Sequence, residues 1–344
     1  MTTQISGVDP EVLDTFLRRS LSELRGKMEI EFIPGGLSNP TFYVTYENRA
    51  LVLRKQPAFG LLPSAHAVDR EYRIMTALHG SDVPVPRTVL FHAGRDVVGT
   101  PFYVMERIEG RIFSDYSLAG VPSSARRGIY LAMAEMMGRL HKIDWKAAGL
   151  SDYGKPGNYF ARQISRWSKQ WQLSKTREDR NFERIIEWLS ANIPASDETT
   201  ICHGDFRLPN VMFHPTEARI VGVLDWELST LGHPLADVAY NCLPWHLLPG
   251  EYGGLRGLDL AALGIPNETD YLEAYYRTVG RHGRVATFHY VFALFRLAVI
   301  FEGVADRARL GTAVAQNSSS VGEFAHTFAG RAVEMIERAQ GHKL

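Results

Sequence analysis

Apolar and polar positions in the first hundred residues predict an N-terminal helix and then mostly strands around a second helix. Asp9 is followed directly by proline, which is typical of an N-cap and the first helical position. Apolar residues then recur at helical spacing as far as Leu24. Ser64 can cap a second helix that continues to about His79. Segments with strand-like patterns lie at 28–33, 41–47, 50–55 and 100–108, and the two prolines of 83–89 favour extended chain there.

Beyond Gly110 the pattern becomes helical, with a short β-rich insert at 200–226. We therefore predict an α+β protein with a small N-terminal lobe of mostly antiparallel strands (1–107) and a large, mainly helical C-terminal lobe (108–344). The linker lies near 106–110, and a cleft between two lobes is a natural ligand site. The predicted helices of the second lobe are 123–143, 158–173, 181–192, 268–280, 285–305 and 321–339.

Composition narrows the class of protein. The chain has 344 residues, with 38 basic and 38 acidic side chains, which argues against a nucleic-acid or anionic-membrane partner held by bulk charge. Cys202 and Cys242 are too few for a disulfide framework, and the N-terminus lacks the features of a signal peptide. These features predict a cytoplasmic protein with two reduced thiols. The most apolar stretch, 285–301, contains His289 and Arg296, so we expect a core helix rather than a membrane span. Nothing in the composition predicts the oligomeric state.

The segment ICHGDFRLPNVMFHPTEARIVGVLDWE (201–227) carries the strongest chemical signal. His203, Asp205 and Asn210 match the spacing of a kinase catalytic loop, H-x-D-x-x-x-x-N. VMF and RIVGVL then predict two strands joined by the turn HPTEA, with Asp225 at the end of the second strand.

These residue types suit phosphoryl transfer, which needs in-line positioning and neutralisation of charge. Asp205 would orient the attacking hydroxyl, while Asn210 and Asp225 would supply oxygen ligands to Mg²⁺. Two other interpretations remain open for His203 and Asp205: a structural hydrogen-bonded pair, or ligands of a hydrolytic metal site. We expect His203 to brace the loop rather than to catalyse.

The motifs HGDFRLPN, LDWELSTLGHPLADVAY and VLRKQP resemble the aminoglycoside phosphotransferase family, which is related to choline kinases and protein kinases. The closest resemblance is to the kinase-like domain that some acyl-CoA dehydrogenases carry at their N-terminus. It covers about residues 25–330 and is most specific over 201–240. It implies a bilobal protein-kinase-like fold, Asp205 as the catalytic residue, and magnesium held by Asn210 and Asp225. Asp237 is expected to be a structural brace, and Glu227 stands where protein kinases have glycine, which leaves open a supporting role near magnesium.

In the N-terminal lobe, VLRK aligns with the kinase V-A-I-K pattern. Val52 and Arg54 share one face of the strand, so Val52 would touch adenine and Arg54 would hold phosphates. The family more often has lysine at this position. Lys55 is an alternative phosphate ligand if the strand is twisted or bulged, and both cations could instead be solvated. Glu71 is the candidate ion-pair partner for this cation, with a solvent-facing glutamate as the alternative.

The remaining nucleotide contacts follow from position and resemblance. The turn at 33–42 stands where kinases have the phosphate-covering loop. The resemblance suggests backbone contacts with adenine at Glu106 and Ile108, with Met105 behind the base. The candidate loop residues are Gly35, Gly36, Ser38 and Asn39.

The predicted activity is transfer of the γ-phosphate of ATP, with Mg²⁺, to a hydroxyl of a small molecule. Residues 241–344 contain ten acidic and ten basic side chains, which gives no support to a polycationic acceptor such as an aminoglycoside. The resemblance to the dehydrogenase-fused domain suggests a hydroxyacyl-CoA, with phosphates near Arg281, Arg284 or Arg307. An aminoglycoside- or choline-type kinase remains an alternative, and a nucleotide-binding pseudokinase scaffold is the alternative of another class.

Overall fold

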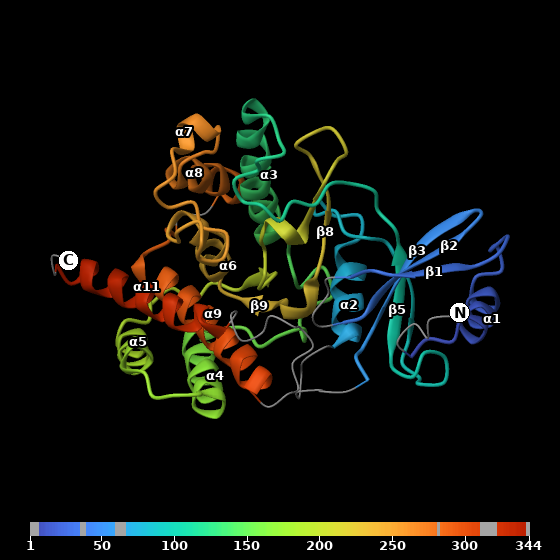
Figure 1. Cartoon of the computed structure of the whole chain (residues 1–344), viewed down its shortest axis with the longest axis horizontal. Coiled ribbons are helices and arrows are strands. Elements are labelled where there is room, and N and C mark those ends of the chain that lie inside the picture. Colours follow the sequence, from blue (N-terminus) through green and yellow to red (C-terminus); the bar gives the residue numbers. More distant parts are fainter. Residues whose placement is uncertain (1–6, 35–38, 59–66, 281–282, 310–321, 342–344) are drawn as a thin grey trace. The chain divides into compact units, whose positions relative to one another are not determined.

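The computed structural model describes residues 7–34, 39–58, 67–280, 283–309 and 322–341 (Figure 1). It contains two compact units. The first extends to Gly110 and also contains Val221–Leu228, whereas the second consists of Arg111–Ile220 and the chain from Ser229 onward. The boundary in the linker therefore lies close to the expected 107/108 division, but the return of 221–228 to the first unit was not predicted.

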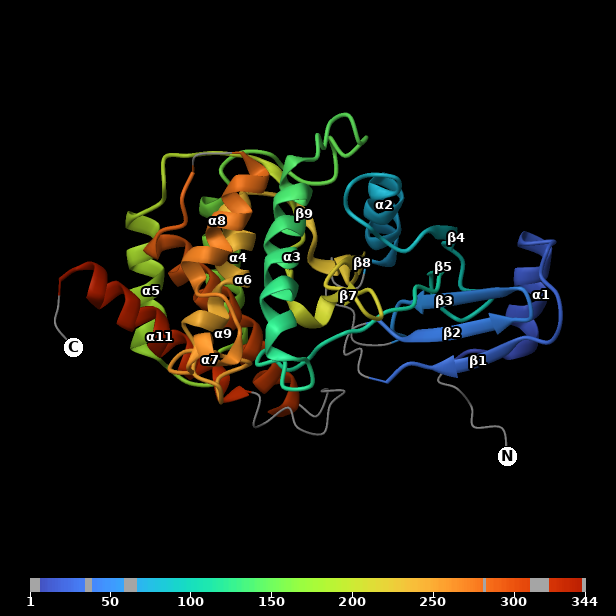
Figure 2. The same ribbon diagram turned by 90° about the horizontal axis from the view of Figure 1, so that it is seen from above.

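The first unit is built on a five-stranded antiparallel sheet in the order β1-β2-β3-β5-β4 (Figure 2). Helix α1 (Pro10–Ser20) precedes the sheet, and Asp9 caps it as predicted by accepting hydrogen bonds from two backbone N–H groups at 2.9 and 3.3 Å. The expected cap at Ser64 lies outside the described residues. The strands are β1 (Glu29–Phe32), β2 (Thr41–Tyr46), β3 (Arg49–Lys55), β4 (Thr88–His92) and β5 (Phe102–Glu106).

The two faces of this sheet differ in character. Leu51 and Leu53 of β3 belong to an apolar cluster with Leu13 and Leu17 of α1. The alternate residues Val52 and Arg54 point to the other face, which carries helix α2 (Val68–Leu78) against β4 and β5. In the strand register, Val52 pairs with Met105 and Arg54 with Tyr103, so these four side chains share the α2 face.

The second unit is mainly helical, as predicted. Two helices were not expected: α6 (Pro234–Asn241) and α7 (Leu260–Leu263). Every residue of α6 is buried, so it has no polar face from which a helical period could be read. The other helices are α3 (Ser123–Lys142), α4 (Tyr159–Ser174), α5 (Arg180–Ala191), α8 (Glu268–Val279), α9 (Thr287–Arg309) and α11 (Phe324–Ala339).

Short strands and turns make up the insert that carries the chemical motifs. Strand β6 (Thr200–Cys202) pairs antiparallel with β9 (Thr230–Gly232). The loop that carries His203 and Asp205 begins directly after β6. The expected hairpin strands are β7 (Val211–Phe213) and β8 (Ile220–Val223). Two 3₁₀ turns lie in this region, η1 (Leu208–Asn210) and η2 (Trp226–Leu228), and a third, η3 (Leu243–Trp245), follows α6.

Helix α9 forms the centre of the second unit and packs against α4, α5, α6 and α11. Its Thr287–Arg307 stretch is long and apolar enough to cross a membrane, but 78% of its most apolar window is buried inside the protein. The prediction of a core helix is confirmed.

Candidate active site

The backbone of the loop that carries Asp205 is fixed by a buried aspartate. Asp237, in the first turn of α6, is 1% exposed and accepts hydrogen bonds from the N–H groups of His203 (2.6 Å) and Gly204 (2.9 Å). Burial would raise the pKa of Asp237, but the hydrogen bond with His141 and the nearby donors outweigh it and lower that pKa. An ionised Asp237 therefore fixes the loop through its backbone N–H groups, which fits the structural role expected for it.

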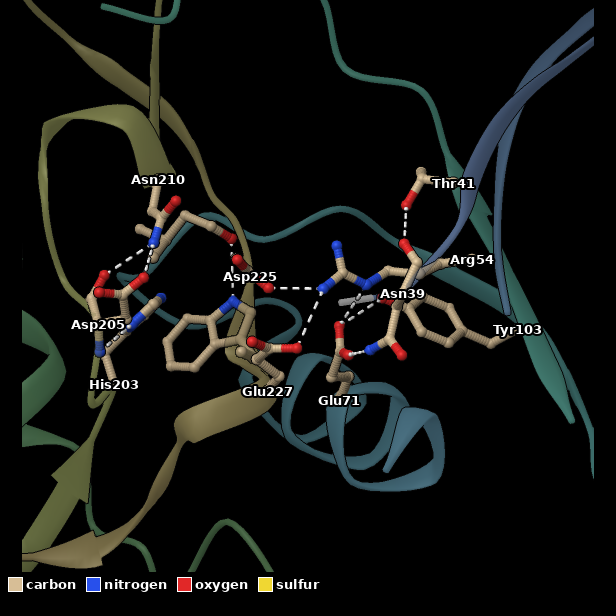
Figure 3. A network of polar contacts seen from close by, with 12 residues as sticks. Asn39, Thr41, Arg54, Glu71, Tyr103, His203, Asp205, Asn210, Asp225 and Glu227 are labelled. Atoms are coloured by element: carbon tan, nitrogen blue, oxygen red, sulfur yellow. Dashed lines mark hydrogen bonds and ion pairs between the residues drawn. The ribbon is translucent and has the colours of Figure 1, made fainter. Parts of the chain in front are cut away.

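Hydrogen-bond donors surround the carboxylate of Asp205 (Figure 3). Asn210 Nδ2 lies 2.7 Å and Arg207 Nε 3.1 Å from Oδ2, and the Tyr240 hydroxyl donates to Oδ1. Burial, together with the neighbouring Asp205, raises the pKa of Tyr240, so its hydroxyl stays protonated as a donor. Because the Asn210 nitrogen is committed to Asp205, the Asn210 oxygen is the atom that could bind a cation.

The structure gives no support to a hydrolytic metal site at His203 and Asp205. His203 is buried, and its Nδ1 accepts a hydrogen bond from the Asp205 N–H at 3.2 Å, as a loop-bracing residue would. Among the described residues, the group able to hold a metal is His141, Cys202 and Asp237, all buried. Asp237 already binds the loop and the Cys202 thiol donates to a backbone carbonyl, so this trio is part of the hydrogen-bonded core.

In the first unit, Arg54 lies among three carboxylates (Figure 3). Its Nε is 2.9 Å from Glu71, and its Nη2 is 2.6 Å from Asp225 and 3.8 Å from Glu227. Burial alone would lower the pKa of Arg54, but Glu71 and Asp225 more than offset this and raise it. Arg54 is thus a permanently charged guanidinium in a partly desolvated site.

Glu71 is buried, with 1% exposure, so the solvent-facing alternative is wrong. Besides its ion pair with Arg54, Glu71 accepts hydrogen bonds from Asn39 Nδ2 at 2.7 Å and from the Tyr103 hydroxyl at 3.0 Å. Burial raises the pKa of Glu71, while Arg54 opposes that shift. The expected ion pair between helix α2 and strand β3 is therefore present.

Lys55 occupies the opposite face of the sheet. Its ammonium group donates to the carbonyl oxygen of Gly7 at 3.2 Å and to that of Val98. The strand is regular here, since Arg54 and Lys55 pair in register with Tyr103 and Phe102. The alternative that Lys55 shares the Arg54 face through a bulge is therefore wrong.

Asp225 has a left-handed backbone conformation, with φ of +63°. Aspartate tolerates this region better than most residues, and the bend turns the chain from β8 into η2. The Trp226 indole N–H donates to the Val223 carbonyl at 2.9 Å and anchors the bend. Three acidic side chains surround one guanidinium. Carboxyl oxygens are the ligands that a hard divalent cation prefers.

The other expected nucleotide contacts have mixed outcomes. Val52 and Met105 face each other across β3 and β5, on the side that carries Arg54. The Glu106 carboxylate pairs with Arg49 (3.3 Å) and with Arg87, and the Glu106 N–H donates to the Arg87 carbonyl at 2.9 Å. Ile108 is half-buried just beyond the strand. Gly35, Gly36 and Ser38 lie outside the described residues. The side-chain amide of Asn39 donates a hydrogen bond to Glu71.

Sequence reasoning missed several side chains in the surroundings of Asp205 and of Arg54. Arg207 lies inside the loop motif, and Tyr240 lies one helical turn after Asp237, which is the spacing that puts both on one face of α6. Tyr103 faces Glu71 because it alternates with Val104 on β5. Arg296 had a visible signal, since an arginine inside so apolar a stretch must find buried partners.

A model of the phosphotransferase enzyme family matches residues 29–275, well over half of the chain. The chain belongs to this family. The α+β, kinase-like fold expected from its motifs is confirmed.

Curated relatives of this phosphotransferase are longer proteins. It is 41% identical over 327 residues to mouse acyl-CoA dehydrogenase family member 10, covering 94% of this chain and 30% of the relative. It is 36% identical over 338 residues to human acyl-CoA dehydrogenase family member 11, covering 96% of this chain and 43% of the relative. The chain thus spans less than half the length of these proteins.

Solved structures show the same fold. A protein of Ralstonia eutropha, provisionally called an aminoglycoside phosphotransferase, has 41% sequence identity and a TM-score of 0.87 over 96% of this chain and 98% of its own. Aminoglycoside phosphotransferase APH(4)-Ia, in complex with AMP-PNP and hygromycin B, has 16% identity and a TM-score of 0.59 over 92% and 97%. The second likeness concerns the fold alone.

Proposed function

We propose that this phosphotransferase transfers the γ-phosphate of ATP to a hydroxyl of a small molecule, with Asp205 as the catalytic carboxylate. The observation that carries the proposal is the environment of Asp205. Its backbone loop is pinned by ionised Asp237, and its side chain is oriented by Asn210, Arg207 and Tyr240. A carboxylate fixed in this way can accept the proton of an incoming hydroxyl and hold the oxygen in line.

The other site residues take roles consistent with that chemistry. Asn210 and Asp225 would bind Mg²⁺, which neutralises phosphate charge when bound. Glu227 lies close enough to Arg54 to support the same anionic cluster. Arg54, oriented by Glu71, would hold the α- and β-phosphates. Nucleotide binding is further assigned to the loop residues and the adenine contacts: Gly35, Gly36, Ser38, Asn39, Val52, Met105, Glu106 and Ile108.

A small pocket lies beside Arg207. It has a volume of about 20 Å³, enough for one water molecule but not for an acceptor. Its polar groups come from Arg207, Asn241 and three tyrosines, and the remaining lining is apolar. The preference for a neutral or anionic acceptor over a polycation therefore depends on the even balance of acidic and basic side chains over 241–344. The lining tyrosines are Tyr116, Tyr240 and Tyr252.

A hydroxyacyl-CoA fits this preference and agrees with the acyl-CoA dehydrogenases among the relatives. The arginines that the sequence suggests for its phosphates do not form one cluster. Arg284 lies before the first turn of α9 and Arg307 near its last, and the helix between Thr287 and Arg307 is about 30 Å long at 1.5 Å per residue. Arg281 lies outside the described residues. We propose a cytoplasmic enzyme, as the sequence suggests.

The test compares the wild-type protein with Asp205→Asn. Each is incubated with γ-labelled ATP, Mg²⁺ and one acceptor from a panel of hydroxyacyl-CoA, unsubstituted acyl-CoA, choline and an aminoglycoside. We expect label on the hydroxyacyl-CoA alone, and a 10²- to 10⁴-fold lower rate in the variant, in the range usual for loss of a positioned base. Nucleotide affinity should not change.

Three outcomes would contradict this assignment. Turnover restricted to aminoglycosides would reject the acyl acceptor. Equal ATP binding by both proteins with no transfer to any acceptor or to water would favour a pseudokinase scaffold. Hydrolysis without ATP would point to a different enzyme class.

A further inference from the structure

Arg296 is a charged residue in the middle of the core helix α9. The surrounding residues Val291–Phe295 and Leu297–Val299 are all buried and apolar, whereas the arginine is 6% exposed. A guanidinium cannot give up its proton to escape burial, so it remains an ion in an apolar core. Burying this charge lowers the stability of the fold unless polar partners compensate for the lost hydration.

Its partners belong to the catalytic loop and its supports. Arg296 Nη2 donates a hydrogen bond to the carbonyl oxygen of Gly204, and its guanidinium carbon lies 5.3 Å from the centre of the Tyr240 ring. Among the described residues, Arg296 forms no ion pair with a carboxylate. A carbonyl dipole and an aromatic face therefore take the place of a counter-ion.

Both partners adjoin Asp205, one in the chain and the other through a hydrogen bond. Gly204 precedes it and has a φ of +81°, a conformation that glycine adopts without strain. Asp237 binds the Gly204 N–H while Arg296 binds the Gly204 carbonyl, so both polar groups of this residue are fixed. The Tyr240 ring that lies against Arg296 carries the hydroxyl that donates to Asp205. Arg296 reaches both supports without contacting Asp205 itself.

We propose that Arg296 is a positioning residue for phosphoryl transfer, which fixes the Gly204 carbonyl and the Tyr240 ring so that Asp205 faces the acceptor hydroxyl. This role rests on the proposed function. Transfer needs the reacting atoms aligned to within a fraction of an ångström, and a displacement of 1 Å can cost about 100-fold in rate.

The experiment uses Arg296→Met, which keeps the length and apolar stem of the side chain, and Arg296→Lys. Glu302→Gln is the matched control, because Glu302 is also buried on α9 but accepts its hydrogen bonds from Thr176, at 2.7 Å. Hydrolysis of γ-labelled ATP gives kcat with water as the acceptor, and titration with AMP-PNP counts the functional nucleotide sites.

We expect Arg296→Met to lower kcat by about 10- to 100-fold, with an unchanged KM for ATP and an unchanged number of nucleotide sites. Arg296→Lys should recover part of the rate because it keeps the charge. Glu302→Gln should remain within about twofold of wild type. Tyr240→Phe should also lower kcat, and the Arg296→Met/Tyr240→Phe double variant should lose less than the product of the single losses.

An unchanged kcat in Arg296→Met overturns the inference, as does a fall in kcat matched by an equal loss of nucleotide sites, which would mean a purely structural role. Strictly multiplicative losses in the double variant overturn it too. These results leave wild-type transfer and the Asp205→Asn defect intact, so they do not affect the proposed function. A wild-type protein without any transfer would refute both.

Discussion

Arg54 Nη2 lies 2.6 Å from Asp225 Oδ1. The cation predicted to hold phosphate thus contacts the carboxylate predicted to hold metal, although 171 positions separate them in the sequence. Glu71 contacts the same guanidinium from helix α2. These residues of the first unit form an ionic cluster in which each charge depends on the others, and substitutions in it should have unequal effects.

Replacing Arg54 with methionine should destabilise the protein by about 3–5 kcal/mol, because Glu71 would remain buried without its counter-charge. Arg54→Lys keeps the charge and should cost less, but it should raise the KM for ATP because a lysine cannot grip phosphate bidentately. Urea unfolding and ATP saturation kinetics measure the two effects. The control is Arg184→Met. The ion pair between Arg184 and Glu337 is partly exposed, so its loss should change the free energy of unfolding by less than about 1 kcal/mol. Equal destabilisation in both methionine variants would contradict the role of burial.

Lys55→Met tests the opposite face of the same strand. The carbonyl groups of Gly7 and Val98 would lose their donor, so we expect a loss of about 1–3 kcal/mol in the free energy of unfolding. The KM for ATP should remain that of the wild type, because the side chain points away from Arg54. A rise in KM comparable to that of Arg54→Lys would show that Lys55 takes part in nucleotide binding.

Asp225 combines a backbone requirement with a charge. Asp225→Asn keeps a residue that tolerates positive φ, so its stability should stay close to wild type. Its transfer rate should fall by at least about 100-fold and its half-saturating Mg²⁺ concentration should rise, because the amide is a weaker ligand. Asp225→Ala should add about 1–2 kcal/mol of strain at the same loss of activity. A Mg²⁺ titration of phosphate transfer would check this, and an unchanged Mg²⁺ requirement would remove Asp225 from the metal site.

His289 predicts an acid-sensitive stability. Burial, and secondarily the neighbouring His233, lower the pKa of His289 from 6.5 to about 4. The unfolded chain therefore takes up this proton first as the pH falls. The stability that neutral His289 contributes is present above about pH 6.5 and is lost as the pH falls towards 4, by about 3 kcal/mol.

Urea unfolding between pH 7 and pH 4 measures this loss. His289→Gln keeps an acceptor for the Ala286 N–H, which donates to His289 Nδ1 at 3.0 Å, and it should flatten the pH dependence by about that amount. His214→Gln, a substitution in the hairpin turn, serves as the control. Identical pH slopes for the wild type and His289→Gln would reject the assignment.

Local chemistry in the sequence predicted much of this fold. The Asp9 cap, the alternation of β3 and the long amphipathic helices each depend on neighbours within a few residues, so pattern alone placed them. Helix α6 was not predicted, because it is buried on all sides and its sequence shows no helical period of polar and apolar residues. The spacing of His203, Asp205 and Asn210 identified the loop, and the contact between Asn210 and Asp205 is local.

What the sequence could not provide are contacts that depend on tertiary packing. Arg296 meets Gly204 across 92 positions, and Tyr240 meets Asp205 across 35. No periodicity encodes such pairings. The choice between Arg54 and Lys55 likewise required the register of β3 against β5 and the position of α1.

The inclusion of Val221–Leu228 in the first unit limits how this protein can be dissected. In the first unit the Val223 N–H donates to the Pro84 carbonyl at 2.8 Å, so the later segment is joined to the earlier one by backbone as well as by Arg54. A truncated polypeptide ending at Gly110 would leave out two of the three acids around that arginine. Isolating the first unit for calorimetry or NMR would therefore require a fusion that supplies the eight-residue segment Val221–Leu228 from the distant part of the gene.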